Sequence, residues 1–133
     1  MTDEPPLQSP WNLGIKVKDL DAELAYLKTC GATGIEVFQD GDRRYAMAFL
    51  GKQRLLLFPK VIYEEALAEP LKFGLAHAVY EVADVQPMLQ RMASQGIKPV
   101  WGPRDGDTPF GRRRMIFFRS PSGFVFEIYQ TLS

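Results

Sequence analysis

Two stretches of the chain share one pattern of hydrophobic and polar positions. Residues 12–32, NLGIKVKDLDAELAYLKTCGA, align with residues 77–97, HAVYEVADVQPMLQRMASQGI, at an offset of 65. Each stretch starts with alternating apolar residues, continues through an Asp into an amphipathic segment, and ends with Gly. This order is typical of a strand, a helix N-cap, a helix and a glycine that ends the helix. The pattern therefore predicts an internal repeat.

Short β-type segments follow each predicted helix. In the first half they are residues 34–38, 44–50 and 54–59, and in the second half 98–102, 112–119 and 124–130. Glycine-containing turns separate them, and DGDTPFG (105–111) is interpreted as a mobile loop, a candidate lid over a site. Each half is thus predicted to be a β-α-β-β-β module, which makes the fold class α+β.

The repeat also suggests how the domain is divided. We expect a flexible N-terminal tail over residues 1–10 and a single domain over residues 11–131. Within that domain the predicted parts are module one over 11–59, a connector over 60–73 with a short helix at 62–68, and module two over 74–131.

Alternation along the strands assigns side chains to the two faces of the sheets. In the first strand Leu13, Ile15 and Val17 share a face, and this apolar set is expected to pack on the helices. The opposite face presents Asn12, and the repeat places His77, the only histidine, at the equivalent position. Laying LLLF (55–58) over FEIY (126–129) relates Leu56 to Glu127 in the same way. The imidazole and the carboxyl group are good ligands, the amide is a weak one, and leucine is none.

Composition limits the classes of partner. Sixteen basic residues balance sixteen acidic ones, so nothing indicates a basic nucleic-acid-binding face. The longest apolar runs, such as 55–58, are too short to span a bilayer, and the acidic, proline-rich N-terminus does not resemble a secretory signal. Cys30 is a single cysteine and excludes an internal disulfide framework. These features favour a soluble, cytoplasmic protein with neither nucleic acid nor membrane as a partner.

Three separate motifs resemble the vicinal oxygen chelate superfamily, which includes glyoxalases, bleomycin-resistance proteins, methylmalonyl-CoA epimerases and extradiol dioxygenases. LGIKVKDLDAELAYL is similar to the first strand–helix unit of that family, LAHAVYEVADVQPML to the second, and RSPSGFVFEIYQ to the closing hairpin and strand. The resemblance covers residues 11–131. It implies two βαβββ modules forming curved mixed sheets around a cavity (glyoxalase/bleomycin-resistance/dioxygenase-like), commonly as a homodimer, with a small molecule as ligand or substrate.

The resemblance also implies functions for particular residues. His77 matches a metal-ligand position, Glu127 matches the final ligand position, and Asn12 stands where the family usually carries a histidine. Leu56 replaces a carboxylate that glyoxalases need, which argues against true glyoxalase activity.

Three alternatives for the chemistry remain open. In the first, His77, Glu127 and Asn12 hold one divalent metal ion, Mg²⁺ or Mn²⁺ rather than Zn²⁺, in a lyase, isomerase or dioxygenase acting on a small oxygenated substrate. In the second, no metal is needed, and Glu127 and His77 are a catalytic acid–base pair that abstracts a proton beside a carbonyl group. In the third, the cavity only sequesters an aromatic or amphipathic molecule, as drug-resistance proteins do.

Further side chains are candidates for lining the pocket. Aromatic rings suit flat ligands, and an arginine from the run 112–114 suits an anionic group. The predicted pocket residues are Leu56, Phe58, Trp101, Arg114 and Tyr129, with Trp11 and Phe110 near the sheet edges. Each candidate also has a plain structural interpretation: His77 and Glu127 as solvated strand residues, the aromatics as core, and the arginines as a charged edge strand.

Overall fold

The computed structural model describes residues 10–133, and its contacts divide them into two compact units, residues 11–78 and residues 79–133. The predicted tail over residues 1–10 lies, apart from Pro10, outside the described residues. The elements of the chain follow the order β-α-β-β-β twice. The α+β fold class and the two predicted modules are thereby confirmed.

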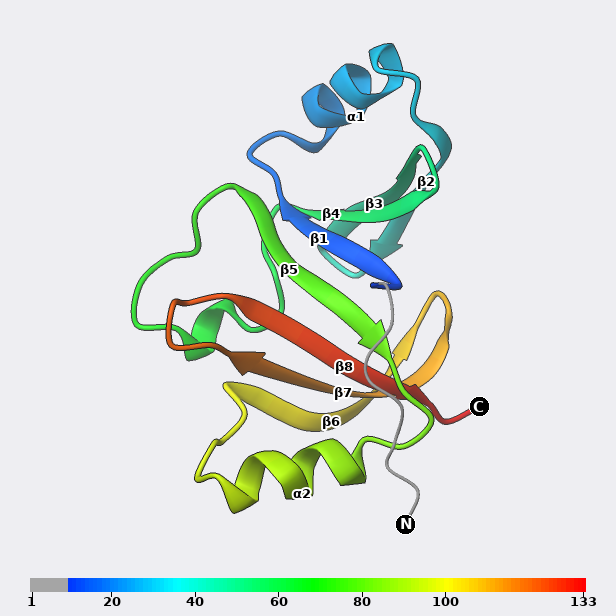
Figure 1. Ribbon diagram of the computed structural model, residues 1–133. Helices are drawn as coiled ribbons and strands as arrows, with labels where there is room; N and C mark the ends of the chain where they lie inside the picture. Colours follow the sequence, from blue (N-terminus) through cyan, green and yellow to red (C-terminus); the bar gives the residue numbers. More distant parts are fainter. Residues whose placement is uncertain (1–9) are drawn as a thin grey trace. The chain divides into compact units, whose positions relative to one another are not determined.

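The first unit is built on a mixed sheet (Figure 1). The strands follow the order β2-β3-β4-β1, with β1 parallel to β4 and the other pairs antiparallel. Its elements are β1 (Asn12–Lys16), α1 (Leu20–Thr29), β2 (Thr33–Asp40), β3 (Arg43–Leu50), β4 (Gln53–Phe58) and the short 3₁₀ helix η1 (Glu64–Ala66). The predicted helix at 62–68 is thus reduced to one 3₁₀ turn.

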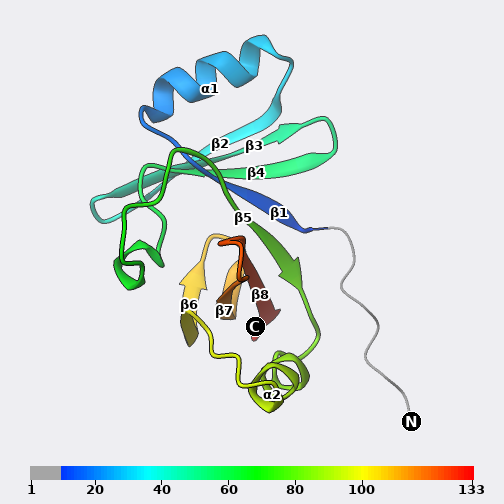
Figure 2. The same ribbon diagram turned by 60° about the vertical axis from the view of Figure 1, so that its left-hand side comes forward.

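Helix α1 covers one face of this sheet (Figure 2). Asp19 caps the helix because its side chain accepts a hydrogen bond from the Ala22 amide at 3.0 Å. Gly31, at φ 94°, ends it as the sequence predicted. The core beneath α1 contains the predicted apolar set, Leu13, Ile15 and Val17, together with Leu20, Leu27, Ala46, Ala48, Leu55 and Leu57. The alternate residues of the same strands therefore lie on the face away from the helix.

The second unit has an antiparallel sheet of order β8-β7-β6, with α2 on one face (Figure 1). Strand β5 (Gly74–Glu81) runs through the point of division between residues 78 and 79. The other elements are α2 (Gln86–Ser94), β6 (Trp101–Thr108), β7 (Gly111–Arg119) and β8 (Val125–Thr131). Val85, Ile116, Phe118 and Ile128 form the core under α2.

The prediction that residues 105–111 form a mobile loop is wrong. Residues 105–108 belong to β6 and pair with β7, and only the turn before Gly111 remains outside a strand. Aspartate and glycine have low β propensity, which concealed the strand. Ion pairs between the two strands compensate for this low propensity. Arg114 Nε lies 2.8 Å from Asp105 Oδ1, and Arg112 Nη1 lies 3.3 Å from Asp107 Oδ1.

Two further details differ from the predictions. Strand β7 pairs with both β6 and β8, so the arginine run does not lie in an edge strand. Alternation along the predicted segment 124–130 puts Phe124 on the same face as Phe126 and Ile128, but Phe124 is 49% exposed and stacks on the Phe126 ring. None of the helices in residues 10–133 has the length and apolar character that crossing a membrane requires.

Candidate functional site

The imidazole of His77 lies against the backbone of Gly14 in the neighbouring strand. A Cβ atom built on Gly14 would lie 2.3 Å from Cε1 and 2.5 Å from Nε2 of the ring, far inside any real contact. His77 occupies the space above position 14, and only 4% of its surface is exposed. The interpretation of His77 as a solvated strand residue is therefore wrong. Only glycine at position 14 leaves room for the ring as it stands.

Tyr63, in the connector, fixes the other side of the imidazole. Its hydroxyl group lies 3.1 Å from Nδ1 of His77 and 3.4 Å from the carbonyl oxygen of Ala76. The tyrosine is fully buried and its ring meets the imidazole edge-on. Burial lowers the pKa of His77 from 6.5 to about 4, so the ring is neutral at pH 7. The sequence analysis missed Tyr63, since connectors carry no periodicity that assigns their side chains to a face.

The candidate residues of the first unit lie on one face of its sheet. Leu56 is paired with Gly14 in the register of β4 and β1, and Asn12 lies two residues before Gly14 on the same strand. Asn12 is 2% exposed, and within the described part of the chain its Oδ1 atom has no hydrogen-bond partner. A buried carbonyl oxygen without a donor is costly, and it marks a place where a ligand donor or a cation would be stabilised.

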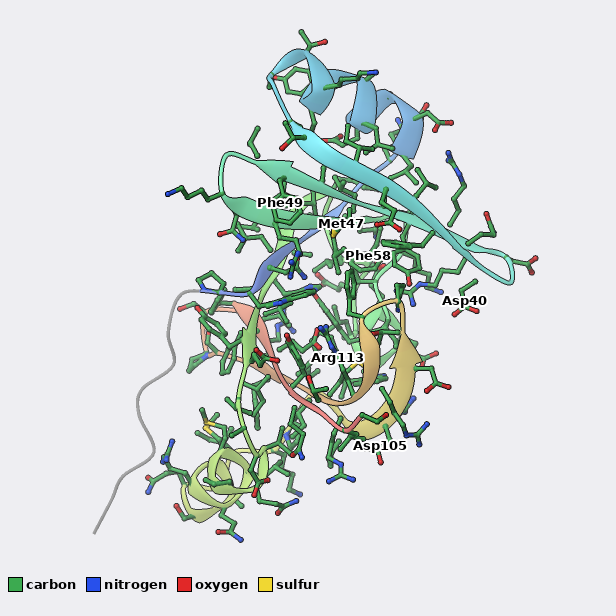
Figure 3. The ribbon with its side chains drawn as sticks, turned by 90° about the vertical axis from the view of Figure 1, so that its right-hand side faces the viewer. Asp40, Met47, Phe49, Phe58, Asp105 and Arg113 are labelled. Carbon is green, nitrogen blue, oxygen red and sulfur yellow. The ribbon has the colours of Figure 1, made fainter. Side chains whose placement is uncertain are left out.

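Aromatic side chains extend this face toward the β2–β3 turn. Phe58 and Tyr45 stack with ring centroids 5.3 Å apart, and Phe38 lies 5.2 Å from Tyr45. Met47 and Phe49 of β3 alternate with the core residues under α1 and so share the face of Phe58 (Figure 3). The predicted pocket residues Leu56 and Phe58 are both buried here.

Glu127 is the main ionisable group of the second unit. It lies in β8 opposite Phe117 of β7, on the face away from the α2 core. Only 8% of the residue is exposed, so the interpretation as a surface carboxylate is wrong. Burial raises the pKa of Glu127 from 4.5 to about 8, and the positive charge of Arg113 opposes that rise. The group is therefore largely protonated at pH 7 and within reach of its ionised form.

The arginine on the face of Glu127 is Arg113 and not the predicted Arg114. Arg113 pairs with Thr131, which alternates in β8 with Tyr129 and Glu127, whereas Arg114 pairs with Gln130 on the other face. The guanidinium of Arg113 is buried and lies 3.8 Å from the centre of the Tyr129 ring. Arg113 and Asp105, the partner of Arg114, point to opposite sides of the β6–β7 hairpin (Figure 3).

Trp101 also lies on the face of the second sheet that carries Glu127 and Arg113. It pairs with Phe117 across β6 and β7, and the two rings meet edge-on at 5.4 Å. Its indole Nε1 is buried and has no acceptor among residues 10–133. An indole N–H is a donor only, so the site offers one unused donor to an acceptor atom.

The structure thus brings the predicted residues together in two groups. Asn12, Leu56, Phe58 and His77 share a face in the first unit, and Trp101, Glu127 and Tyr129 share one in the second. That His77 and Glu127 face a common cavity stays a prediction, as do the assigned functions. The described residues contain no group of three or more His, Cys, Asp or Glu side chains able to hold a metal ion.

Several solved structures share the fold of this chain. Methylmalonyl-CoA epimerase from Mycobacterium tuberculosis is 20% identical, with a TM-score of 0.69 over 100% of this chain and 94% of its own. A variant of the Streptomyces coelicolor methylmalonyl-CoA epimerase, in complex with 2-nitronate-propionyl-CoA, is 21% identical, with a TM-score of 0.63 over 96% of this chain and 100% of its own. A glyoxalase/bleomycin resistance protein/dioxygenase superfamily member from Vibrio splendidus is 18% identical, with a TM-score of 0.60 over 89% and 94%. Identities this low show a common fold and no more.

Sequence comparison gives the family directly. No match is found among curated proteins. One family model matches residues 12–117, which include the strands of Asn12, Leu56 and His77. With the βαβββ repeat, this match shows that the chain belongs to the Glyoxalase/Bleomycin resistance protein/Dioxygenase superfamily.

Proposed function

We propose that this protein is an isomerase-type enzyme that moves a proton at the carbon beside a carbonyl group of a small oxygenated molecule. Glu127 is the acid–base group, and His77 and Asn12 bind polar atoms of a ligand. The proposal combines the membership of the superfamily with the state of the two ionisable groups.

The observation that carries the proposal is the buried carboxyl group of Glu127, with its pKa near 8. Proton transfer is fastest when the pKa of the catalytic group lies near the working pH, because both the acid and the base are then populated. A group that alternates between these forms can remove the proton beside a carbonyl group as the base and return it as the acid, so that the proton balance closes on one side chain. An ordinary surface carboxylate has too low a pKa to serve as the acid.

Groups without partners support a polar ligand. The Asn12 carbonyl oxygen and the Trp101 indole N–H are both buried and have no hydrogen-bond partner in the part of the chain described here. In the second unit a ligand carbonyl or carboxylate oxygen could accept from the indole, and in the first unit a ligand hydroxyl or N–H group could donate to Asn12.

A divalent metal ion at His77, Glu127 and Asn12 is the second candidate chemistry. The neutral imidazole and the Asn12 oxygen are suitable donors, but Leu56 on the same face supplies none. This donor set does not fit a glyoxalase-type centre. The measurement is metal content after purification without a nickel column. Stoichiometric metal that is lost in His77→Ala would support the metal site, and substoichiometric metal in both proteins would contradict it.

Sequestration without catalysis is the third candidate, and the stacked rings of Tyr45 and Phe58 favour it. Binding alone predicts saturable affinity for a flat molecule and no chemical change in it. Saturable ligand binding without any proton exchange would favour sequestration over catalysis.

The test of the main proposal is proton exchange in D₂O. Methylmalonyl-CoA, the ligand named for one of the structural relatives, is the first probe, followed by simple 2-substituted carboxylic thioesters. NMR would follow the loss of the proton signal beside the carbonyl group. We expect exchange in the wild type, loss of at least about a hundredfold in Glu127→Gln, and no change in Glu69→Gln, an exposed control in the connector after η1.

The pH dependence adds a second criterion. Because Glu127 must lose its proton to act as a base, the rate should rise with pH, reach half of its maximum near pH 8 and level off above it. A rate that is identical in Glu127→Gln and in the wild type would overturn the assignment of this residue.

A further inference from the structure

A cleft of about 480 Å³ lies in the first unit, between the β2–β3 turn and the chain that follows β4. Its lining residues are Asp42, Arg43, Arg44, Pro59, Lys60, Val61 and Ile62. The volume is within the range of small-molecule sites in proteins. None of these residues belongs to the group around His77.

The charges around the cleft are unbalanced. Three of its side chains are cationic and Asp42 alone is anionic. Arg44 is partly neutralised by Asp21 at 2.8 Å, outside the lining. The Lys60 ammonium forms no hydrogen bond or ion pair within residues 10–133, and the residue is exposed. The lining residues themselves therefore carry more positive than negative charge.

Arg43 is held in place by aromatic rings. Its guanidinium lies 4.9 Å from the centre of the Tyr45 ring and 5.1 Å from that of Phe58. A guanidinium that stacks on a ring keeps its N–H groups in the plane and available to a planar or tetrahedral anion. Asp40 pairs with Arg43 in the register of β2 and β3 but is not part of the lining.

The opposite wall is rigid and apolar. Pro59, Val61 and Ile62 form it, and Val61 is almost completely buried. Glu64 fixes this wall because its carboxylate accepts a hydrogen bond from the Val61 amide at 2.8 Å and pairs with Lys16 of β1. Ile62 remains 39% exposed, so apolar surface faces the cleft beside the cations.

We propose that this cleft binds the phosphate or carboxylate group of a small molecule whose remaining part is apolar or aromatic. Arg43 and Lys60 contact the oxyanion, and Pro59 and Ile62 contact the apolar part. The inference stands apart from proton transfer at Glu127, since it involves none of the residues assigned to that function.

The experiment is titration calorimetry of the full chain at low ionic strength with four probes. Phenyl phosphate and benzoate test the two kinds of oxyanion, phenol lacks the anion, and inorganic phosphate lacks the ring. We expect an aromatic oxyanion to bind more tightly than either phenol or phosphate. The stronger of the two aromatic anions identifies the preferred group. Affinity should fall as salt is added, because exposed charges are screened.

Variants distinguish binding in the cleft from binding to other cationic parts of the surface. Lys60→Ala should weaken binding about three- to fivefold, as for an exposed ion pair, and Arg43→Gln about tenfold, as for a hydrogen bond to a charged group. Lys52→Ala, in the exposed β3–β4 turn, removes the same charge outside the cleft and should have no effect.

Each result of these titrations either supports or overturns the anion site in the cleft. Equal binding by wild type and Lys60→Ala, or phenol binding as tightly as the aromatic anions, would overturn the anion site. Loss of probe binding in Lys60→Ala with proton exchange unaffected supports the cleft whatever happens to the function proposed for Glu127. Absence of proton exchange with normal probe binding would remove only that function.

Discussion

Replacing His77 with glutamine should change how the free energy of unfolding depends on pH. The imidazole is buried, and its pKa falls from 6.5 in the unfolded chain to about 4 in the folded protein. Between these values the unfolded chain binds more protons than the folded one, so stability rises with pH and is fully present above pH 6.5. Glutamine does not titrate, so the variant lacks this contribution.

The magnitude follows from the two pKa values. One pKa unit corresponds to about 1.4 kcal/mol, so the change from 6.5 to about 4 corresponds to about 3 kcal/mol. Glu127 acts in the opposite sense. Its pKa is raised from 4.5 to about 8, so its contribution is present below pH 4.5 and is lost as pH rises toward 8. Between pH 4.5 and 6.5 the two slopes nearly cancel in the wild type.

The assay is urea unfolding at half-unit steps from pH 4 to pH 8 for wild type, His77→Gln and Glu127→Gln. The difference in unfolding free energy between wild type and His77→Gln should grow by about 3 kcal/mol from pH 4 to pH 6.5. Other carboxyl groups contribute equally to both proteins and cancel in that difference. In Glu127→Gln the curve should rise to pH 6.5 and then stay level.

A direct measurement accompanies the stability curves. Because His77 is the only histidine, its ring carbon and nitrogen signals are unambiguous in an NMR titration. A midpoint between pH 6 and 7, with parallel stability curves for wild type and His77→Gln, would refute the buried, neutral imidazole. The packing of His77 against Gly14 would then also be wrong.

Three further substitutions test the surroundings of these groups. Gly14→Ala places a methyl group on the His77 ring and should cost about 1–3 kcal/mol of stability, measured by urea unfolding; an unchanged midpoint and unchanged ring signals would contradict the contact. Tyr63→Phe removes the hydroxyl beside Nδ1 and should cost about 1 kcal/mol, with a shift of the ring ¹⁵N signals that a distant control such as Tyr26→Phe does not produce. Arg113→Met removes the charge that lowers the pKa of Glu127, so ¹³C NMR of the carboxyl group should show that pKa rising above about 8. A fall in this pKa would show that Arg113 does not stabilise the ionised carboxylate.

Periodicity gave the placement of most strand residues. Alternation in the first strand placed Leu13 and Val17 under α1, and the repeat then put Asn12 and His77 on the other face. These assignments need only the two-residue period of a strand. The segment predicted over residues 98–102 shares only residues 101 and 102 with strand β6 (Trp101–Thr108). The rest of β6 was missed because aspartate and glycine disfavour strands locally, while the arginines that stabilise it lie in another strand.

The choice between Arg113 and Arg114 shows a different limit. A run of arginines alternates between faces, but which one shares the face of Glu127 depends on the register of β7 against β8. Register arises from pairing between strands and is absent from either strand alone. Tyr63 was missed for a related reason, since a connector has no repeating pattern to orient its side chains.

The contact between positions 14 and 77 constrains how this sequence can vary. A larger residue in β1 and an imidazole in β5 compete for one volume, so position 14 cannot be enlarged without strain while His77 is kept. A library of variants that randomises positions 14 and 77 together should yield folded pairs in which a larger side chain at one position accompanies a smaller side chain at the other. Grafting the histidine onto another scaffold would likewise require transplanting the glycine.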